Sequence, residues 1–347
     1  RNQQFSLSGK KAKKGTPHKR IRIRIIMELV KAVEQRGVLG DALVHLGAEF
    51  PQLVVLSPDV SLSTKAIKFK EAFPERFICS GIAEQNTIGM AAGMSTMGLI
   101  PVVAGYAMFV GGKAWEPIRN SIAYSHFNVK IVATHSGINV GPDGVTHQSI
   151  EDIALMRVIP GMVVLAPTDA NQVEPALRAA FQINGPVYIR LERAAIPLIT
   201  DPNQSVNLGE SLQLREGKDI TIFAIGGMVH QALQSAEELA SENIEARVVS
   251  LYSIKPIDSG AIIRAANETG AIVTAEDHNC YGGLGGAVAE VLALHAPCVM
   301  EQVAVQDTFA ESGPAKDLYA KFHLTSTDIA AAARRAIQRR NAARRVN

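Results

Sequence analysis

The chain has 347 residues, of which 47% are hydrophobic, and its 35 basic and 33 acidic residues give a formal net charge of +2 at pH 7. This length and apolar content predict two domains with packed cores. No apolar run reaches the roughly 18–20 residues of a membrane-spanning helix, so we expect no membrane partner. The three cysteines, Cys79, Cys280 and Cys298, form neither a CxxC pair nor a zinc-binding spacing, which is typical of reduced thiols in a cytoplasmic protein.

Positive charge is concentrated at the two ends of the chain. Residues 1–24 carry nine Lys or Arg and no acid, and residues 334–347 carry six Arg and no acid. The remaining residues comprise 20 basic and 33 acidic side chains, a net charge of −13. Basic segments of this kind bind nucleic acids or membrane surfaces in some proteins and are solvated extensions in others. We expect a disordered extension at 1–24, without the apolar core of a signal peptide, and no nucleic-acid partner.

Short apolar runs alternate with helical patterns in the first half of the chain. The runs are continuously hydrophobic rather than alternating, so both faces of each strand should be covered, as in a parallel sheet. The predicted strands are residues 53–60, 100–106, 129–135, 162–167 and 187–192. The predicted helices are residues 112–125 and 168–181, the second of which begins with Thr168 and Asp169.

A polar segment at 197–207 interrupts this alternation, which then resumes. The later predicted strands are residues 219–226, 246–253, 271–277 and 297–305, and the later helices are 228–241, 285–295 and 326–340. The fold class is therefore α/β, with two three-layer domains built on mainly parallel sheets. We place the domains at 25–196 and 208–325, the linker at 197–207, and a C-terminal helix with a basic tail at 326–347.

Polar or aromatic side chains follow most of the predicted strands of the first domain. Ligands of open α/β sheets bind at the carboxyl ends of the strands, so these side chains are the first candidates for a functional site. The candidates are Asp59, Ser61, Ser63, Glu84, Tyr106, Phe109, His135, Asp143, His147 and Arg193.

Several of these candidates also have a purely structural interpretation. An acid such as Glu84 is favoured by the dipole at a helix N-terminus, whatever its function. Tyr106 and Phe109 are equally typical of a hydrophobic core, and His135 of a buried, hydrogen-bonded histidine. The residues taken singly therefore leave both interpretations open.

The histidine-containing loop raises the question of a metal site. Asp143 and His147 suggest acid–base chemistry or recognition of sugar hydroxyls. Together with His135 they could bind a metal, but their spacings of eight and four residues in a Gly-rich loop do not match the helix-borne HExxH arrangement. We therefore expect no metal ligands in this chain. The Gly-rich residues 282–286 are a weak match to a phosphate loop, and close packing at a helix start explains them as well.

Longer segments of the sequence resemble the transketolase family. The segments that resemble its pyrimidine-binding domain are "GIAEQNTIGMAAGM", "YAMFVGGKAWEPIRNSIA", "VKIVATHSGINVGPDGVTHQSIEDIALMR" and "VYIRLERAAIP". The segment "EDHNCYGGLGGAVAEVL" is similar to the C-terminal domain of the same family. The resemblance covers about residues 30–325, and the "DG-x-THQ" pattern with its upstream "ATH" is the most specific part.

This resemblance implies thiamine diphosphate as the cofactor. Glu84 matches the glutamate whose carboxyl binds N1′ of the aminopyrimidine ring and so promotes removal of the proton from C2 of the thiazolium. Such a carboxyl should be buried and apart from competing cations in order to share a proton, and the uncharged stretch from Gln85 to Tyr106 agrees. Tyr106 and Phe109 match the aromatic residues that stack on the pyrimidine, and Asp59 matches an acid close to the cofactor.

The resemblance also implies sugar phosphates as substrates. The residues that match substrate-binding positions are Arg36, Ser61, Ser63, His135, Asp143, His147 and Arg193. The two arginines would clamp the phosphate, because a guanidinium is permanently charged and binds oxyanions with two hydrogen bonds. Asp143 and His147 match residues that bind donor hydroxyls and transfer protons, which makes His147 a catalytic candidate beside Glu84. Gly112 departs from the family, since some relatives have an aromatic or polar residue there.

A diphosphate-binding segment is missing from the sequence. In this family its signature is GDG followed by an asparagine, which together hold Mg²⁺ or Ca²⁺ through oxygen ligands. The only similar segment, "PDG" at 142–144, has Pro142 in place of the first glycine and is rejected. The resemblance therefore implies the small, C-terminal subunit of a split transketolase, which transfers a two-carbon ketol unit from a ketose phosphate to an aldose phosphate. A large subunit would supply the diphosphate and metal site, and we expect an α2β2 assembly.

Other functions remain open at this point. The β subunit of a 2-oxo acid dehydrogenase E1 combines the same two domains, and deoxyxylulose-phosphate synthase shares residues of the "DG-x-THQ" type. The E1 subunit would not be expected to carry this pattern or Arg193, and the synthase normally keeps all its domains in one chain. Outside enzymes, the alternatives are a scaffold or regulatory relative and a nucleic-acid-binding module. Consumption of pyruvate, ketol transfer and salt-dependent binding to duplex DNA would discriminate among them.

Overall fold

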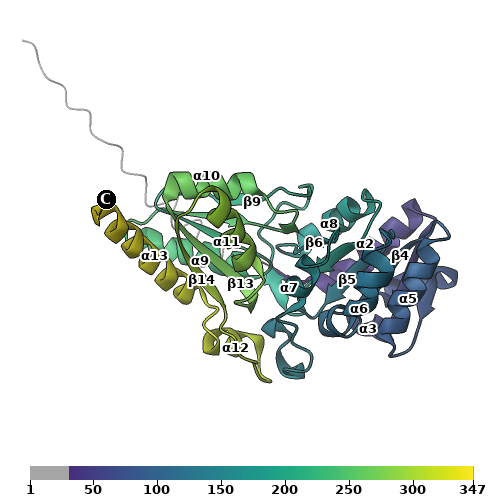
Figure 1. Ribbon diagram of the computed structural model, residues 1–347. Helices are drawn as coiled ribbons and strands as arrows, with labels where there is room; N and C mark the ends of the chain where they lie inside the picture. The colour runs from purple at the N-terminus through teal and green to yellow at the C-terminus, as the bar shows by residue number, and fades with distance from the viewer. Residues whose placement is uncertain (1–30, 347) are drawn as a thin grey trace, which may run out of the picture. The chain divides into compact units, whose positions relative to one another are not determined.

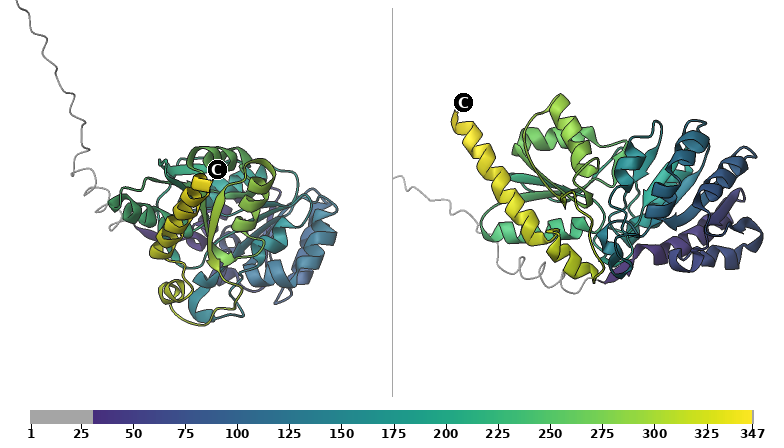
Figure 2. Two further views of the ribbon diagram at one scale, coloured as in Figure 1. Left: turned by 60° about the vertical axis from the view of Figure 1, so that its left-hand side comes forward. Right: turned by 60° about the horizontal axis from the view of Figure 1, so that its bottom comes forward.

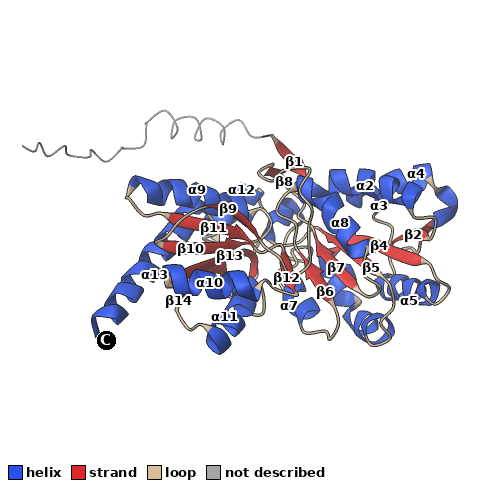
Figure 3. Ribbon diagram, turned by 90° about the horizontal axis from the view of Figure 1, so that it is seen from above, coloured by secondary structure: helices blue, strands red, loops and turns tan. Residues whose placement is uncertain are grey.

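Two β-sheets and a short two-stranded ribbon organise the described part of the chain, residues 31–346 of a computed structural model (Figure 1). The predicted extension 1–24 lies outside the described residues. Figure 3 shows the strands in two groups, each flanked by helices, so the predicted α/β fold with mainly parallel sheets is confirmed. Within residues 31–346, none of the helices combines the length and the hydropathy that crossing a lipid bilayer requires.

The larger sheet has seven strands in the order β12-β6-β7-β5-β4-β2-β3. Six of them pair in parallel, and β12 pairs antiparallel with β6 at one edge. Every residue of β2, β5 and β7 is buried, which explains the apolar centres of these strands; the charged Lys130 and Arg190 lie at strand ends. The strands are β2 (Leu53–Ser57), β3 (Phe77–Cys79), β4 (Ile100–Tyr106), β5 (Lys130–Thr134), β6 (Val163–Leu165), β7 (Val187–Arg190) and β12 (Ser253–Lys255).

Helices cover both faces of the larger sheet. On one face α2, α4 and α8 pack through residues such as Leu39, Phe69 and Leu177, and on the other α5 and its neighbours pack through Ile88 and Val110. The helical segments of this half are α2 (Gln35–Glu49), α3 (Ser61–Thr64), α4 (Ile67–Ala72), η1 (Pro74–Arg76), α5 (Glu84–Ser95), η2 (Ala107–Lys113), α6 (Trp115–Pro117), η3 (Ile118–Ala123), η4 (Ile138–Asp143), α7 (Asp152–Arg157), η5 (Ala170–Gln172) and α8 (Val173–Phe181).

The smaller sheet has five strands in the order β14-β13-β10-β11-β9, of which only β9 is antiparallel. Helices α9 and α13 contribute to the core on one face, and α10 and α11 to the core on the other, which also includes residues of the larger sheet. Figure 2 shows α13 running along one side of this sheet. The elements are β9 (Leu212–Arg215), β10 (Ile220–Ala224), α9 (Met228–Ser241), β11 (Ala246–Ser250), α10 (Ser259–Thr269), β13 (Ala271–Asn279), α11 (Leu284–His295), β14 (Val299–Val305), α12 (Ala315–Lys321) and α13 (Ser326–Val346).

The two-stranded ribbon brings together segments that are about 160 residues apart in the sequence. Strand β1 (Ala32–Glu34) pairs antiparallel with β8 (Ala195–Pro197), and Glu34 lies opposite Ala195. Arg36 lies two residues after β1 and Arg193 two residues before β8, so the ribbon brings both arginines to the same edge of the larger sheet.

Arginines of the C-terminal helix are largely engaged within the protein. Ion pairs join Arg334 to Glu238 and Glu242, and join Arg335 and Arg339 to Glu301. Arg340 donates to the backbone carbonyls of Asp219 and Thr269. These contacts explain the basic composition of this helix by its packing on an acidic surface rather than by an external polyanion.

The predicted helix at 112–125 differs from the observed structure. Helical turns begin earlier, at Ala107, and run as a π-helix to Lys113, a short α-helix at Trp115–Pro117 and a second π-helical stretch at Ile118–Ala123. A π-turn accommodates one residue more than an α-turn, and such turns frequently occur at functional sites. Pro117 lacks a backbone N–H and so interrupts regular α-helical hydrogen bonding. The 3.6-residue pattern of the sequence contains no signal for this change.

Candidate functional site

Glu84 is the buried acid at the start of α5. Glu84 is only 3% exposed, although it is the first residue of a helix that follows an exposed loop. Strand β3 ends at Cys79, and the chain then turns through Gly81, whose φ of 71° favours glycine. The side chain of the preceding residue, Ala83, provides no helix cap. The turn therefore brings the carboxylate of Glu84 to the edge of the sheet and buries it there.

The expected absence of cations around Glu84 is contradicted. The Nζ atom of Lys113 lies 2.7 Å from Oε2 of Glu84, and the lysine side chain is 52% exposed. Gln85 also donates a hydrogen bond from its side chain to the backbone carbonyl of Lys113, at 3.2 Å. The uncharged stretch after Glu84 gave no warning, because the partner lies 29 residues later at the end of the π-helix η2.

Four predicted site residues form one aromatic cluster. The ring centroids of Tyr106 and His135 are 3.9 Å apart, and those of Tyr106 and Phe109 are 6.2 Å apart with nearly parallel planes at 29°. His147 meets Phe109 edge-on, with centroids 5.1 Å apart. Tyr106 and Phe109 are only half-buried. The interpretation of these two rings as ordinary core residues is therefore the weaker one.

His135 is buried at the end of β5 with a left-handed backbone, φ 58°. Its Nδ1 atom lies 2.8 Å from the hydroxyl of Thr134. Burial first, and then the nearby charges of Arg36 and Arg193, lower the pKa of His135 to about 3. The imidazole is therefore neutral at physiological pH and is able to donate one hydrogen bond and accept another.

The two candidate arginines approach His135 from different segments. Arg193 donates to the backbone carbonyl of Val140 at 2.8 Å, and its Nη2 atom lies 3.7 Å from the carboxylate of Asp143. The buried Nε of Arg193 has no protein partner among the described residues. A buried donor without a partner is costly, so this N–H gains stability from any acceptor that reaches it.

Arg36 has a carboxylate partner that was not predicted. Its Nε and Nη2 atoms are each 3.0 Å from the carboxylate of Glu34, and its Nη1 donates to the backbone carbonyl of Ser63 at 3.2 Å. The hydrogen bond from Arg36 lowers the pKa of Glu34, and the charges of Lys65 and Arg193 act in the same direction. The only sequence signal was the spacing Glu-x-Arg, which is common on protein surfaces.

The loop that carries Asp143 and His147 is fixed by the smaller sheet. Both carboxylate oxygens of Asp277, in β13, accept hydrogen bonds from the backbone N–H groups of Ile138 and Asn139. Gln148 donates to the backbone carbonyl of Glu311 at 3.0 Å, beyond β14. Both halves of the chain therefore position this loop, which the sequence assigned to the first half alone.

The remaining candidates, Asp59, Ser61 and Ser63, lie after β2. Asp59 has a left-handed backbone, φ 59°, and its carboxylate lies 3.7 Å from the thiol of Cys79. Ser61 begins α3, and Ser63 contacts Arg36 through its carbonyl rather than its hydroxyl. Ser63 is thus in contact with Arg36, whereas Asp59 is in contact with Cys79.

The Gly-rich segment at 282–286 holds an anion that belongs to the protein itself. The carboxylate of Glu276 accepts hydrogen bonds from the backbone N–H groups of Leu284 and Gly285, at 2.6 and 2.8 Å. A side chain on Gly283 would collide with this carboxylate. The segment is therefore a packing feature of α11 and not a phosphate site.

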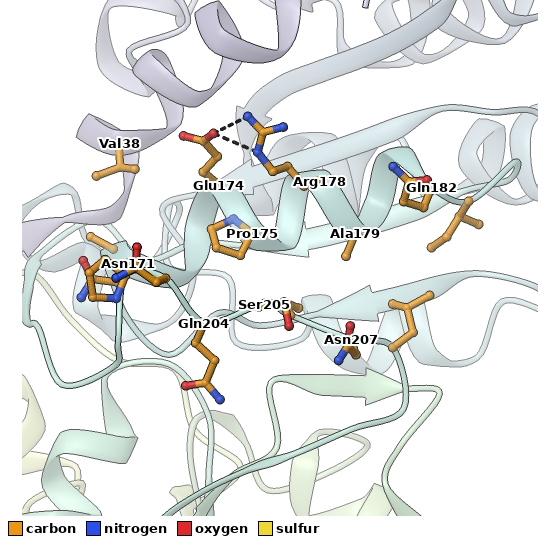
Figure 4. A pocket seen from close by; sticks show the side chains of 16 residues that line it. Val38, Asn171, Glu174, Pro175, Arg178, Ala179, Gln182, Gln204, Ser205 and Asn207 are labelled. Carbon is orange, nitrogen blue, oxygen red and sulfur yellow. Dashed lines mark hydrogen bonds and ion pairs between the residues drawn. The ribbon is translucent and has the colours of Figure 1, made fainter. Parts of the chain in front are cut away.

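A cavity of about 870 Å³ lies elsewhere, between α8 and the segment 202–208 (Figure 4). Its lining is mostly apolar, and Arg178 at its rim pairs with Glu174. None of the predicted site residues lines it. Among residues 31–346, no group of three or more His, Cys, Asp or Glu side chains is arranged to hold a metal ion.

Comparison with known sequences gives matches along most of the chain. Residues 31–198 match the transketolase pyrimidine-binding domain, and residues 209–329 match the transketolase C-terminal domain. A putative transketolase C-terminal section of Methanocaldococcus jannaschii is 44% identical over 84% of this chain and 92% of its own length. The 6-deoxy-6-sulfo-D-fructose transketolase subunit SqwH of a Clostridium species is 40% identical over 88% of this chain and 95% of its own length.

Longer relatives match over only part of their length. A 1-deoxy-D-xylulose-5-phosphate synthase of Heliobacterium modesticaldum is 36% identical over 85% of this chain but only 46% of its own length. Among solved structures, a split-gene transketolase in the form of an inactive β4 tetramer is 47% identical, with a TM-score of 0.82, and the match covers 89% of this chain and 99% of that one. The transketolase of Leishmania mexicana is 25% identical with a TM-score of 0.75, over 90% of this chain and 47% of its own.

Proposed function

The chain belongs to the thiamine-diphosphate-dependent transketolase family, and from this premise we propose that it is the small subunit of a split transketolase. It transfers a two-carbon ketol unit from a ketose phosphate to an aldose phosphate when a large subunit supplies the diphosphate-binding domain. The observation that carries the proposal is the buried Glu84 at a helix start, beside a half-buried aromatic pair and two arginines at the same sheet edge.

The residues at this edge fit the pyrimidine half of the cofactor. When bound, thiamine diphosphate supplies a carbanion that attacks a ketose carbonyl. Glu84 holds the pyrimidine by a hydrogen bond from its carboxyl group, and burial keeps water from competing for that bond. Tyr106 and Phe109 offer half-exposed ring faces for stacking, and Asp59 lies at the end of β2 on the same sheet.

Lys113 has to leave Glu84 before the carboxyl can bind the cofactor. The ion pair occupies the Oε2 atom of the buried carboxylate, so this oxygen is not available to the pyrimidine while Lys113 stays in place. The half-exposed lysine is free to turn toward solvent, because its long side chain reaches water without moving the backbone. Displacement of this lysine is therefore a local event that precedes activation.

The substrate is held by the remaining residues of the cluster. The neutral His135 donates one hydrogen bond to a sugar oxygen, while Asp143 and His147 bind the donor hydroxyls and transfer protons between them. Arg36, Arg193 and the serines Ser61 and Ser63 hold the terminal phosphate. The unpartnered N–H of Arg193 supports this assignment.

The partner subunit carries the diphosphate site, with Mg²⁺ or Ca²⁺ bound by its oxygen ligands. Two relatives that match over 92% and 95% of their own lengths, one called a C-terminal section and the other a subunit, support a division of the enzyme between two chains. Ile82 beside Glu84 is 76% exposed, and no neighbouring atom of residues 31–346 lies within 4 Å of a Cβ atom placed on Gly89 or Gly93 of α5. We assign this surface to the partner and the assembly to an α2β2 tetramer.

Calorimetry with thiamine diphosphate and Mg²⁺ tests the proposal. Cofactor binding should be weak or absent for the chain alone and should appear when a large subunit is added. Tight binding by the isolated chain would contradict the division of the site. The assembled enzyme should then form new ketose phosphates without consuming pyruvate; consumption of pyruvate would favour a deoxyxylulose-phosphate synthase or an E1 enzyme instead. Failure of every reaction with cofactor bound would favour a scaffold.

A further inference from the structure

Arg36 is already neutralised by the protein before any ligand binds. The carboxylate of Glu34 accepts two hydrogen bonds of 3.0 Å, from Nε and Nη2 of Arg36. The backbone carbonyl of Ser63 accepts a third from Nη1. Three of the five N–H groups of a guanidinium are thus occupied. Two-bond pairing with a carboxylate is the contact by which an arginine also binds a phosphate. Glu34 therefore occupies one of the two faces that Arg36 offers to an anion.

The position of Glu34 is set by the backbone rather than by chance. It is the last residue of β1, in register with Ala195 of β8, and it directly precedes α2. Its carboxylate feels the charges of Lys65 and Arg193 as well as that of Arg36. The ribbon thus inserts one negative charge into a cluster of three cations from three segments of the chain.

The formal charge of this cluster follows directly. Arg36, Arg193 and Lys65 contribute three positive charges, while Glu34 and Asp143 contribute two negative ones. With histidines counted as neutral, the excess is one positive charge. A terminal group with one negative charge balances it, whereas a phosphate monoester carries about −1.5 to −2 at pH 7. Among these five groups, the second charge of a phosphate dianion would have no matching cation, and the carboxylate of Glu34 on Arg36 would repel it.

We propose that Glu34 is a specificity-determining residue that makes this site prefer a sugar whose terminal group carries one negative charge over one with a phosphate dianion. The inference rests on the proposed function and narrows its donor class. Ketose phosphates remain substrates but bind less tightly than the matching sulfonates, which have the same tetrahedral shape and a single charge. Glu34 acts by repulsion, which is how a site commonly gains selectivity between ligands of similar shape.

The test compares a ketohexose 6-phosphate with the matching 6-sulfonate. Values of kcat/KM are measured for the complex of the chain with its large subunit, and calorimetry measures the affinity of both sugars for the chain. The variants are Glu34→Gln, which removes the charge at constant volume, and Glu34→Asp, which keeps it. Glu49→Gln is the matched control, because Glu49 makes an equivalent two-bond pair with Arg178 at the far end of α2.

The expected result is a change in the ratio of the two substrates. Glu34→Gln should raise the preference for phosphate over sulfonate by about fivefold, the upper end of the effect of one partly exposed charge interaction. Glu34→Asp and Glu49→Gln should leave the ratio within about twofold of the wild-type value. An unchanged ratio in Glu34→Gln would overturn the inference. This is the result expected if substrates simply displace the side chain of Glu34, which is 42% exposed. Equal losses for both sugars would assign Glu34 to holding Arg36 and would also overturn it.

Failure of the proposed function gives a different result. In that case the assembled enzyme transfers no ketol unit from either sugar, in the wild type or in any variant. The inference is then tested only by the ratio of the two affinities, for the 6-phosphate and the 6-sulfonate, that calorimetry measures. A shift toward phosphate in Glu34→Gln supports charge selection at this site for another reaction, and no shift overturns it.

Discussion

The carboxyl ends of the two sheets carry similar residues but use them differently. At the larger sheet the end residues stay partly open: Tyr106 and Phe109 are half-buried, and the Nε of Arg193 has no protein partner among the described residues. At the smaller sheet, β13 ends in the buried acids Glu276 and Asp277. Each of these acids accepts three hydrogen bonds from the protein.

The comparison shows how a functional site differs from a structural joint, the name used here for the buried contact that Glu276 and Asp277 make at the end of the smaller sheet. Polar residues at strand ends are found in both, so residue type alone does not discriminate. In the joint, the carboxylates of Glu276 and Asp277 have their hydrogen-bond donors within the chain, because a buried charge without partners is costly. A site keeps groups unsatisfied or weakly paired, as at Arg193 and at the exposed lysine that covers Glu84. Variants at the two edges should therefore affect activity and stability in opposite proportions.

Glu84→Gln should produce the largest effect, on activity alone. Glutamine keeps the volume but cannot share a proton, so ketol transfer by the assembled enzyme should fall by about 10²–10⁴-fold. The free energy of unfolding should change by less than about 1 kcal/mol, since the half-exposed Lys113 that loses its partner turns to water. Steady-state kinetics and urea denaturation measure the two quantities. Glu116→Gln, at an exposed acid nearby, is the control; an active Glu84→Gln enzyme would remove Glu84 from the reaction.

Asp277→Asn should show the reverse, a large loss of stability. Asp277 accepts hydrogen bonds from the backbone N–H groups of Ile138 and Asn139 and from the hydroxyl of Tyr319. An amide nitrogen in place of one oxygen would face these donors, so the free energy of unfolding should fall by about 2–4 kcal/mol. Asp307→Asn, on the exposed surface after β14, should have little effect. Equal stability of the two variants in urea would contradict the description of this edge as a joint.

Glu192, which follows β7 and accepts hydrogen bonds from Asn139 and Gly227, should make the free energy of unfolding depend on pH. Burial first, and then the charge of Asp277, raise the pKa of Glu192 to about 7, against the N–H of Gly227 and the charge of Arg190, while Asn139 donates to the carboxylate. The folded state therefore binds this proton more tightly than the unfolded state. The stabilisation is complete below the ordinary carboxyl pKa and is lost as the pH rises through about 7.

Urea denaturation between pH 5 and pH 8 measures this dependence. The free energy of unfolding of the wild type should decline over this range, and Glu192→Gln should remove up to about 3 kcal/mol of the decline. Glu245→Gln, at an exposed acid, should keep the wild-type slope. An identical slope in Glu192→Gln would mean that Glu192 does not titrate in this range.

Lys113→Met should give the smallest effect and a gain in binding. Removing the cation frees the carboxyl of Glu84, so thiamine diphosphate should bind the assembled enzyme about two- to fivefold more tightly, the usual range for a partly exposed ion pair. Calorimetry with the large subunit and Mg²⁺ measures this change. Lys68→Met removes a similar pair with Asp41, at 2.6 Å, and should change nothing. Weaker binding in Lys113→Met would instead give the lysine a supporting role in the complex.

Much of the fold was predictable from the sequence. The nine predicted strands all occur, because uninterrupted apolar runs such as 100–106 suit only a strand covered on both faces. Outside these nine, β3 lies in the apolar run "RFICSGIA" that precedes Glu84. The strands β1, β8, β9 and β12 were missed, since each has only three or four residues and pairs with a distant segment. The π-helix at Ala107–Lys113 was missed because its residues also fit an ordinary helix.

The candidate site was predictable in its composition but not in its charge pairing. Tyr106, His135 and His147 do meet in one cluster, as the strand-end rule and the family resemblance predicted together. The ion-pair partners of Glu84 and Arg36 were not predicted; they are Lys113 and Glu34, respectively. Lysines and glutamates are frequent on every surface, so nothing in their sequence context marks these two.

The sequence by itself determined the α/β fold, the family and the kinds of side chain gathered at one sheet edge, because these follow from hydrophobic runs and from motifs that are continuous in the chain. Only the tertiary structure decided which charges meet. Glu84 and Lys113 are 29 residues apart, and Arg193 lies about 160 residues after Arg36. An ion pair depends on a separation of a few ångströms, and packing of whole helices and strands sets that separation.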